Sequence, residues 1–259
     1  MHTVEKALAL AKWGTTGLRE LQHAYRVRNI NKFGATATAG TSETVIVTGN
    51  TTTFLTAAKT IEVVSSSTAD TAAGNGCRTL TIFGCDSDFN EISEVITTNG
   101  QSDSADTSQS FLRVYRARCT TTGTYHGANT GDITVKTSDD EVMLVMPAGR
   151  GSSETSVFTT FVNTKAYITQ MKLQCAPSGS ATGNLFLNIH NGVDVVSVPF
   201  NSRRTEKAFR GLTNVTQEFD FDSYIEVPEK SDIWLSAIFS TGTTNVMSAD
   251  YSFRLLYFS

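Results

Sequence analysis

Charged side chains are scarce in this chain. Asp, Glu, Lys and Arg make up 18% of its 259 residues, against about 25% in typical soluble domains. The formal net charge of -4 argues against a nucleic-acid partner, because nucleic-acid binders present an excess of positive charge to phosphate groups. Ser, Thr, Asn and Gly replace the missing charges, which is typical of β-rich fibre and capsid proteins.

Long apolar runs are also missing. No stretch of about 20 apolar residues occurs, and a helix needs roughly that length to cross a bilayer. We therefore expect no membrane span. The first residues contain neither a long apolar core nor a small-residue cleavage site, so we expect no signal peptide.

Metal-binding spacings are absent too. The four cysteines, Cys77, Cys85, Cys119 and Cys175, form no CxxC pair, which predicts reduced, packed thiols rather than disulfides or a metal site. The four histidines follow no HExxH or Cys/His spacing. We expect no metal and no cofactor.

One acidic stretch begins like a calcium loop. Asp86 and Asp88 stand at the first and third positions, but the sixth is Glu91 and the twelfth is Thr97. An EF-hand needs Gly and Glu at those two positions, so the loop fails that pattern and is interpreted as a solvated turn.

Catalytic motifs are equally few. Neither a G-x-S-x-G elbow nor a P-loop occurs, and both would be needed for their respective chemistries. Asp220, Asp222 and Glu226 are the densest acidic cluster. Alternation places Asp220 and Asp222 on one strand face, which we interpret as a solvent-facing surface. The sequence predicts that the chain is not an enzyme.

What the chain does contain is a series of short alternating strands. Arg78–Phe83 alternates apolar and hydroxyl side chains, Glu91–Thr97 follows after a turn-rich segment, and Phe111–Ala117 comes third. Asn99–Gly100 is a strong turn signal. Short strands with turn chemistry between them predict an antiparallel β-sandwich.

A sequence pattern runs through this region. It consists of turn and strand residues: Asp70–Gly74, Gly76, Arg78–Thr79, Phe89–Glu91, Ser93–Glu94, Asn99–Gly100, Phe111–Val114, Asn129 and Gly131–Val135. The pattern resembles a family of tailed-phage virion structural proteins that is common in phages of aquatic bacteria. Looser similarity covers most of the chain. The resemblance implies a virion building block, assembled in the host cytoplasm, and carries over no active site.

The C-terminal half predicts a second β domain. Asn191–Gly192 is a hairpin turn, Arg203–Arg210 is expected to be a basic loop, and the acidic turn at Thr137–Glu141 precedes the boundary. The expected strands are Val157–Val162, Ala166–Gln174, Leu185–Ile189, Val193–Val198, residues 219–227, Ile233–Phe239 and Tyr251–Phe258. This order of strands and turns suits a jelly roll.

The N-terminal residues differ from the rest. Residues 1–33 hold six basic and two acidic residues, a net charge of +4, so the remainder carries -8. Narrow apolar stripes at helical spacing predict a short helical arm over residues 1–34. We expect it to dock on another subunit or on the virion body; the alternative is a helix lying on its own β domain. The docking residues would be Leu8, Trp13, Leu18, Leu21, Tyr25, Arg26 and Arg28.

Three places are candidates for contacts between subunits. Arg113 and Arg116 lie on one strand, and the alternative for them is solvated charge balanced by nearby glutamates. Arg203 and Arg204 lie in the expected basic loop. Leu256 and Phe258 share a face at the end of the last strand, whose other face, with Phe253 and Leu255, is expected to be core.

Together these observations predict an all-β fold of two β-sandwich domains, residues 35–140 and 141–259, the second jelly-roll-like, behind the N-terminal arm. The expected function is a structural tail or neck appendage, or a fibre-like protein. It would form homo-oligomers, with a trimer favoured by resemblance to phage fibres and decoration proteins, and would bind other virion proteins. The alternatives are a capsid decoration protein and a carbohydrate-binding or glycan-hydrolysing module that recognises a host surface glycan.

Overall fold

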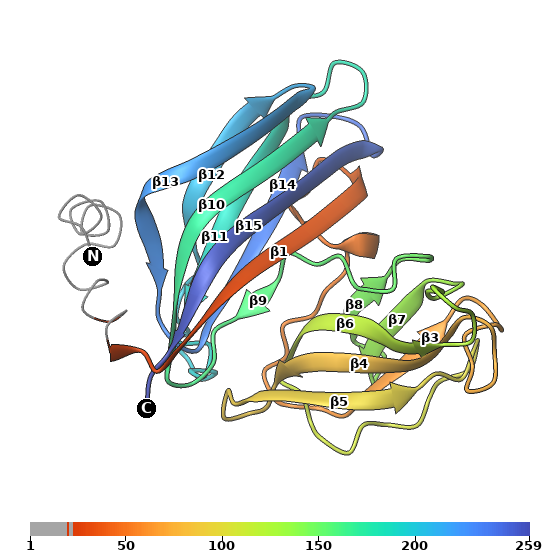
Figure 1. Cartoon of the computed structure of the whole chain (residues 1–259). Helices are drawn as coiled ribbons and strands as arrows, with labels where there is room; N and C mark the ends of the chain where they lie inside the picture. The colour runs from red at the N-terminus through yellow and green to blue at the C-terminus, as the bar shows by residue number, and fades with distance from the viewer. Residues whose placement is uncertain (1–19, 21–22) are drawn as a thin grey trace.

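The computed structural model describes Glu20 and residues 23–259 (Figure 1). Within these residues the chain is all-β, as the sequence predicts: it forms strands β1 to β15 and one short 3-10 turn, η1 (Thr48–Asn50). All the strand pairings are antiparallel. None of the described residues forms a helix long and apolar enough to cross a membrane.

The predicted helical arm is wrong where the structure describes it from Arg26 onwards. Residues 26–39 form a long strand, β1 (Arg26–Ala39), which pairs along its length with the last strand, β15 (Asn245–Tyr257). The helical apolar spacing lies before β1, and within β1 the pairing with β15 buries alternate residues, a period of two. The expected docking residues Leu8, Trp13, Leu18 and Leu21 lie outside the described residues.

A four-stranded sheet and a five-stranded sheet form a sandwich. Sheet I has the order β1-β15-β10-β13, and sheet II has the order β12-β11-β14-β2, with β9 also paired to β14. The further strands are β2 (Thr44–Val45), β9 (Phe158–Thr159), β10 (Thr164–Ala176), β11 (Gly183–Asn191), β12 (Arg204–Leu212), β13 (Val215–Val227) and β14 (Ser231–Phe239).

The pairings in the sandwich are nested. Without β9, the first strand pairs with the last (β1 with β15), the second with the second last (β2 with β14), and so on through β10 with β13 to β11 with β12. These pairs fall alternately in sheet I and sheet II. The eight strands are therefore one long antiparallel hairpin rolled into two layers.

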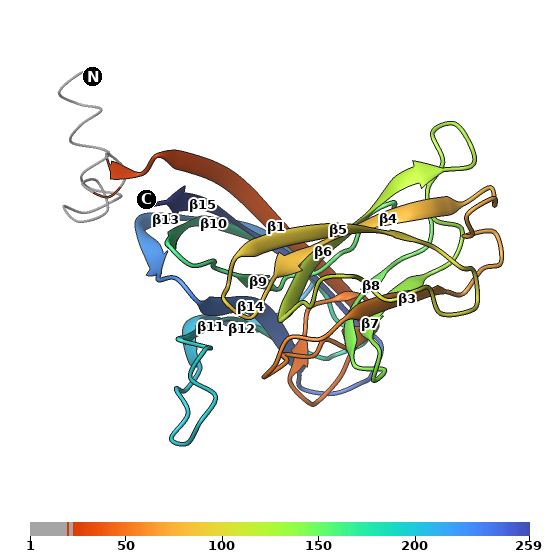
Figure 2. The same ribbon diagram turned by 90° about the horizontal axis from the view of Figure 1, so that it is seen from below.

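A separate pair of sheets is inserted between β2 and β9, over residues 48–157; we call this segment the insert. One three-stranded sheet has the order β3-β7-β8 and the other β5-β4-β6. Their bounds are β3 (Ile61–Ser65), β4 (Cys77–Cys85), β5 (Glu91–Thr97), β6 (Arg113–Thr122), β7 (Ile133–Thr137) and β8 (Val142–Met146). Figures 1 and 2 show the insert beside the sandwich, near β1.

The pairings differ from the boundaries expected at 34/35 and 140/141. β1 and β2 belong to the sandwich, although residues 35–45 were assigned to the first domain, because they pair with β15 and β14. β8 belongs to the insert, because it pairs with β7. Both pairings join segments across a gap in sequence that local patterns do not report.

A buried carboxylate explains the first part of the sequence pattern. Asp70 is fully buried, and its two oxygens accept hydrogen bonds from four groups. The donors are Ser65 Oγ and the backbone N–H groups of Cys77, Thr130 and Gly131, at 2.6, 2.7, 2.8 and 2.9 Å. A buried charge is tolerated only when it is hydrogen-bonded in this way. Asp70 thus joins the two ends of the pattern and has a structural role.

The insert and the sandwich share one hydrophobic core. Tyr115 of β6 lies against Phe158 of β9 and against Phe161, with ring centroids 5.1 and 5.8 Å apart. Phe158 in turn contacts Phe253 of β15 at 4.8 Å. Phe253 and Leu255 are buried, which confirms their prediction as core residues.

The hairpin expected after Asn191 is wrong. Residues 192–203 leave the sheet as a loop, and the segment expected to be a basic loop is instead strand β12. Gly192 has a φ of 61°, and the next N–H, of Val193, donates to the carbonyl of Lys230 rather than to a hairpin partner. The charged residues of β12 fit its position at the edge of sheet II, since charges discourage unwanted strand pairing.

Candidate functional site

Arg113 is not a surface contact. Its guanidinium is buried and forms a forked ion pair with the buried carboxylate of Asp232, with Nη2 2.8 Å from Oδ2. It also donates to the carbonyls of Leu55 and Leu112. The prediction that it contacts another subunit is therefore wrong: Arg113 fastens the insert to β14 of the sandwich.

Leu256 is likewise buried, so its prediction as a subunit contact is wrong. It packs with Tyr167 of β10, and Phe258 lies partly buried against this pair. The backbone N–H of Phe258 donates to the carbonyl of Asn163. The C-terminal end of the β15 face that points away from the main core is thus covered by neighbouring residues of the same chain.

The remaining predicted contact residues lie at the surface and bind within the chain. Arg203 pairs with Glu43 at 2.7 Å, and Arg204 with Glu206 at 3.0 Å. Exposed pairs of this kind contribute little to stability. Whether they meet a second subunit stays a prediction. Arg116 is half-buried and lines a small cleft together with Lys32.

The described residues of the expected arm also face their own chain. Arg28 donates to Glu91 of the insert at 2.6 Å, and Arg26 lies 4.9 Å from the ring centroid of Tyr257. Burial would raise the pKa of Glu91, but hydrogen bonds from Arg28 and Tyr115 outweigh it and lower that pKa. These contacts hold β1 to the insert. Tyr25 is exposed, and its ring meets the edge of Tyr257.

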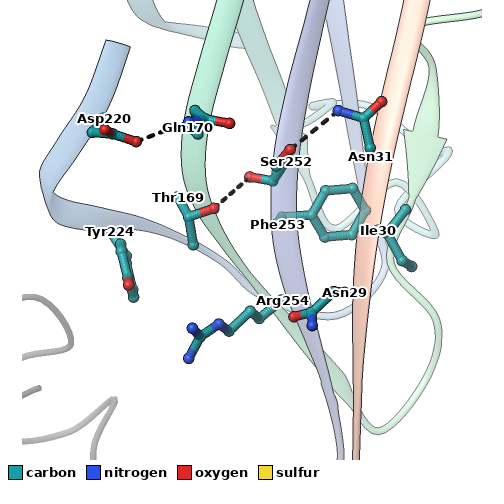
Figure 3. Close-up of a pocket in the computed structure, with 10 residues that line it drawn as sticks. All are labelled: Asn29, Ile30, Asn31, Thr169, Gln170, Asp220, Tyr224, Ser252, Phe253 and Arg254. Atoms are coloured by element: carbon teal, nitrogen blue, oxygen red, sulfur yellow. Dashed lines mark hydrogen bonds between the residues drawn. The ribbon is translucent and has the colours of Figure 1, made fainter. Parts of the chain in front are cut away.

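A polar groove of about 430 Å³ crosses sheet I (Figure 3). Its side chains are linked to one another: Gln170 donates to Asp220 at 3.0 Å, and Asn31 donates to Ser252 at 3.1 Å. Thr169 donates to the carbonyl of Ser252 at 3.1 Å. Amide, hydroxyl and carboxylate groups close together can hydrogen-bond a polyhydroxylated ligand.

An apolar cleft of about 370 Å³ lies between the insert and sheet II. Phe54 and Trp234 form part of its wall, with ring centroids 5.3 Å apart, and the Arg113–Asp232 pair lies at its edge. His190 also lines it, and its buried Nε2 has no hydrogen-bond partner among the described residues. The cleft is thus mainly apolar with a few polar groups, as small binding sites are.

The loop after β11 forms the outer wall of this cleft. We call residues 193–200 the apolar loop. Figure 2 shows that it projects from the body between β11 and β12. Its exposed large side chains are Val195, Val196, Val198 and Phe200. Val198 is 79% exposed and Phe200 61%. Four large apolar side chains exposed within six positions are unusual for an isolated monomer.

The acidic candidates show no catalytic arrangement. The carboxylate of Asp86 is used within its own turn, because it accepts hydrogen bonds from the N–H groups of Asp88 and Asn90, each at 2.9 Å. Asp220 and Asp222 are exposed, as alternation predicts. Across the part of the chain that the structure describes, no three His, Cys, Asp or Glu residues gather as metal ligands would.

Comparisons with known proteins give no family. No protein-family model matches the chain, and no curated protein matches it. Among solved structures, the infectious bursal disease virus Gt strain structure is similar at a TM-score of 0.26 and 11% identity, over 90% of this chain and 73% of that one. T=1 particles derived from infectious bursal virus give a TM-score of 0.27 and 11% identity, over 91% and 70%.

A mitogen from Yersinia pseudotuberculosis is also similar, at a TM-score of 0.21 and 14% identity, over 37% of this chain and 80% of that one. The likeness to a viral capsid protein and a mitogen is weak. At such scores it carries no argument for function, which must come from the residues of the chain itself.

Sequence reasoning missed three residues that the structure makes important: Asp70, Lys32 and Asp232. Asp70 opens the sequence pattern, and the glycine-rich stretch after it was a signal for a tightly folded turn. Asp232 stands between Ser231 and an apolar run, a place where a charge suggests burial with a partner. Lys32 gave no signal, because one Lys in a polar segment is usually solvated.

Proposed function

We propose that the chain is a structural component of a tailed-phage virion and that it works by associating with copies of itself. The resemblance of its sequence pattern supports this, and the hydrogen bonds of the buried Asp70 give the start of that pattern a structural role. From the nested order of the eight sandwich strands we infer a jelly roll, an architecture used by viral capsid proteins and by lectins. One fold can serve many functions, so the function has to be inferred from the surface of the molecule.

The exposure of the apolar loop is the main support for self-association. Its exposed Val198 and Phe200 stand beside an apolar cleft on the same molecule. The loop of one copy can therefore enter the cleft of the next, a head-to-tail contact that closes into a ring when the rotation allows. Burying apolar area in this way yields about 25 cal/mol per Å². We expect the closed form to be a trimer.

Mass measurement in solution tests this contact. The double variant Val198→Ser with Phe200→Ser should convert the oligomer to a folded monomer, because both side chains are exposed and leave the core untouched. The matched control is Val95→Ser, which removes an exposed valine from β5 of the insert. If the control dissociates equally, or if the loop variant keeps its mass, the contact lies elsewhere.

Within the virion we propose an appendage of the tail or neck, or a fibre-like component, ahead of a capsid decoration protein. The basis is the expectation that residues 1–34 dock on the virion body. Within that range, β1 from Arg26 onwards belongs to the sandwich. Any docking by the arm therefore rests on residues before Arg26. Labelling of particles with an antibody to the sandwich distinguishes a tail position from a capsid position.

The polar groove of sheet I supports a second candidate function, binding of a neutral host glycan. Gln170, Asp220 and Asn31 offer hydrogen-bonding groups along one face (Figure 3), and Tyr224 offers a ring for stacking against a sugar. Binding of neutral oligosaccharides that is lost in Gln170→Ala would favour this function. Release of reducing ends would identify a hydrolase. No binding by the wild type would remove both.

A further inference from the structure

A basic cleft of about 260 Å³ lies where β1, β6 and residues 150–155 meet. Its cationic side chains come from three segments: Lys32, Arg116, Arg118 and Arg150. Among the described residues, Glu154 is the one acidic residue that lines it. This concentration of positive charge stands out in a chain whose net charge is -4.

Backbone pairing fixes the shape of the basic cleft. Arg116 and Arg118 are two positions apart on β6, so both side chains leave the same face of the strand. The segment opposite is held against β6, because the N–H of Cys119 donates to Gly151 at 2.9 Å and Arg118 pairs with Ser152. The two arginines therefore project from an ordered strand that the sheet holds in place.

Most of the positive charge in the cleft has no counter-charge. Arg150 pairs with Glu154 at 3.3 Å. Among the described residues, Lys32, Arg116 and Arg118 form no ion pair. Arg28, by contrast, has a counter-charge, because it forms an ion pair with Glu91 at 2.6 Å.

Lys32 is the most unusual of the three. Its side chain is buried, with 3% exposure, and its ammonium donates to the carbonyl of Tyr115 and lies 5.7 Å from the centroid of that ring. Burial, and then the charge of Arg116, lower the pKa of Lys32 well below its ordinary value. Burial and the charge of Arg118 lower the pKa of Arg116 in the same way.

Such an arrangement weakens the fold, because a buried Lys and a half-buried Arg without a carboxylate partner cost free energy that apolar side chains would not. Local costs of this kind are typical of functional sites. An anion in the cleft would supply the missing counter-charge. The guanidinium groups of Arg116 and Arg118 offer the forked donors that oxyanions accept, and the hydroxyl of Ser152 lines the same cleft.

We propose that the basic cleft binds a phosphate or sulfate group. The volume of about 260 Å³ is below the roughly 300–1,000 Å³ of pockets for drug-sized ligands, so it suits one such group rather than a large molecule. The group can be a free ion or an ester on a polysaccharide. The inference is independent of the proposed virion function and of the polar groove.

Isothermal titration calorimetry tests the site with four probes: sodium phosphate, sodium sulfate, a short dextran sulfate and unsulfated dextran. The wild type should bind the anionic probes and not unsulfated dextran, and added NaCl should weaken binding by screening. Tighter binding of dextran sulfate than of the free ions identifies a polysaccharide ester as the source. Equal binding identifies the free ion.

Lys32→Met and Arg116→Met should each weaken binding about tenfold or more, since each removes a charge-assisted interaction. Lys32→Met should also melt at a higher temperature than the wild type, which shows that its loss of binding is not a loss of folding. The matched control is Arg210→Met, an arginine of β12 that lies over Phe186 outside the cleft. It should bind as the wild type does.

Three results would overturn the proposal. The first is a wild type that binds neither phosphate, sulfate nor dextran sulfate. The second is equal weakening in Arg210→Met, which would mean unspecific attraction. The third is a fall in oligomer mass in Arg116→Met without any anion binding by the wild type, which would assign the cleft to a carboxylate of a second copy.

Discussion

Replacement of Arg113 should lower the free energy of unfolding, because Arg113 joins the insert to the sandwich. Arg113→Ala leaves the carboxylate of Asp232 buried, with 2% of its side chain exposed. Its remaining side-chain donor is Thr159 Oγ1, at 2.6 Å. The same change also leaves the carbonyl of Leu55 without the donor that reaches it at 2.6 Å. The carbonyl of Leu55 and the carboxylate of Asp232 therefore both lose their hydrogen bonds from Arg113.

The size of the effect follows from that orphaned charge. Breaking a buried ion pair from one side costs about 3–5 kcal/mol, a large share of the roughly 5–15 kcal/mol that stabilises a typical domain. The matched control is Arg203→Ala. Arg203 pairs with Glu43 at 2.7 Å, close to the 2.8 Å of the Arg113–Asp232 pair, but 52% of its side chain is exposed. Exposed pairs contribute about 0–1 kcal/mol.

Urea denaturation followed by tryptophan fluorescence measures both variants. Trp234 lies in the cleft beside the Arg113–Asp232 pair, so its emission reports on this junction. The double variant Arg113→Met with Asp232→Leu should recover most of the loss, because it leaves no charge unpaired. The reasoning is refuted if Arg113→Ala costs no more than Arg203→Ala, or if the double variant is less stable than the single one.

Three further predictions concern the fold. Asp70→Asn should cost about 2–4 kcal/mol in urea denaturation, because its amide hydrogens would face N–H donors and the charge-assisted bonds would be lost; a cost under about 1 kcal/mol would contradict the network. The pKa of Lys32 lies well below its ordinary 10.5. Between that lowered pKa and 10.5 the unfolded chain binds one proton more than the folded chain, so the free energy of unfolding rises with pH. Lys32→Met should flatten this rise in Tm, and an unchanged slope would contradict it. Deletion of residues 1–33 should abolish the β circular dichroism signal, since it removes most of the β1 pairing with β15, whereas deletion of residues 1–19 should keep it; a folded protein without residues 1–33 would show that β1 is dispensable.

Local patterns predicted many strands well. Glu91–Thr97 has the bounds of β5, and Ile233–Phe239 lies within β14. Both are short apolar or alternating runs between turn residues, and a strand of that kind is specified by its own sequence. Phe253 and Leu255 were also identified as core, because alternation distinguishes the two faces of β15.

The failures concern pairing across long separations. Residues 26–33 were assigned to the helical arm, because the partner that makes them a strand is β15, more than 200 residues away, with Arg26 opposite Tyr257. The apolar alternation of Val193–Val198 suggested a strand, although in the fold it lies in a projecting loop. Apolar residues predict burial somewhere, and they do not distinguish a core from an exposed contact surface.

The basic cleft was only half visible in the sequence. Arg116 drew attention as a charge on the strand that also carries Arg118, but Lys32 is more than 80 residues away from them in the chain. The three meet because β1 crosses the insert, and Gly34 permits the close approach: a Cβ there would lie 2.9 Å from the backbone nitrogen of Ser156 in the insert. Such a crossing depends on the tertiary arrangement and not on any local motif.

The central claim is that the chain is a virion building block that associates through the apolar loop. Cryo-EM of intact particles, purified from lysates that contain the chain, tests it most directly. The account predicts copies of the sandwich arranged about a closed symmetry axis, with Val198 and Phe200 of one copy in the cleft beside Trp234 of its neighbour. Particles without density for the chain, or copies whose apolar loops all face solvent, would contradict it.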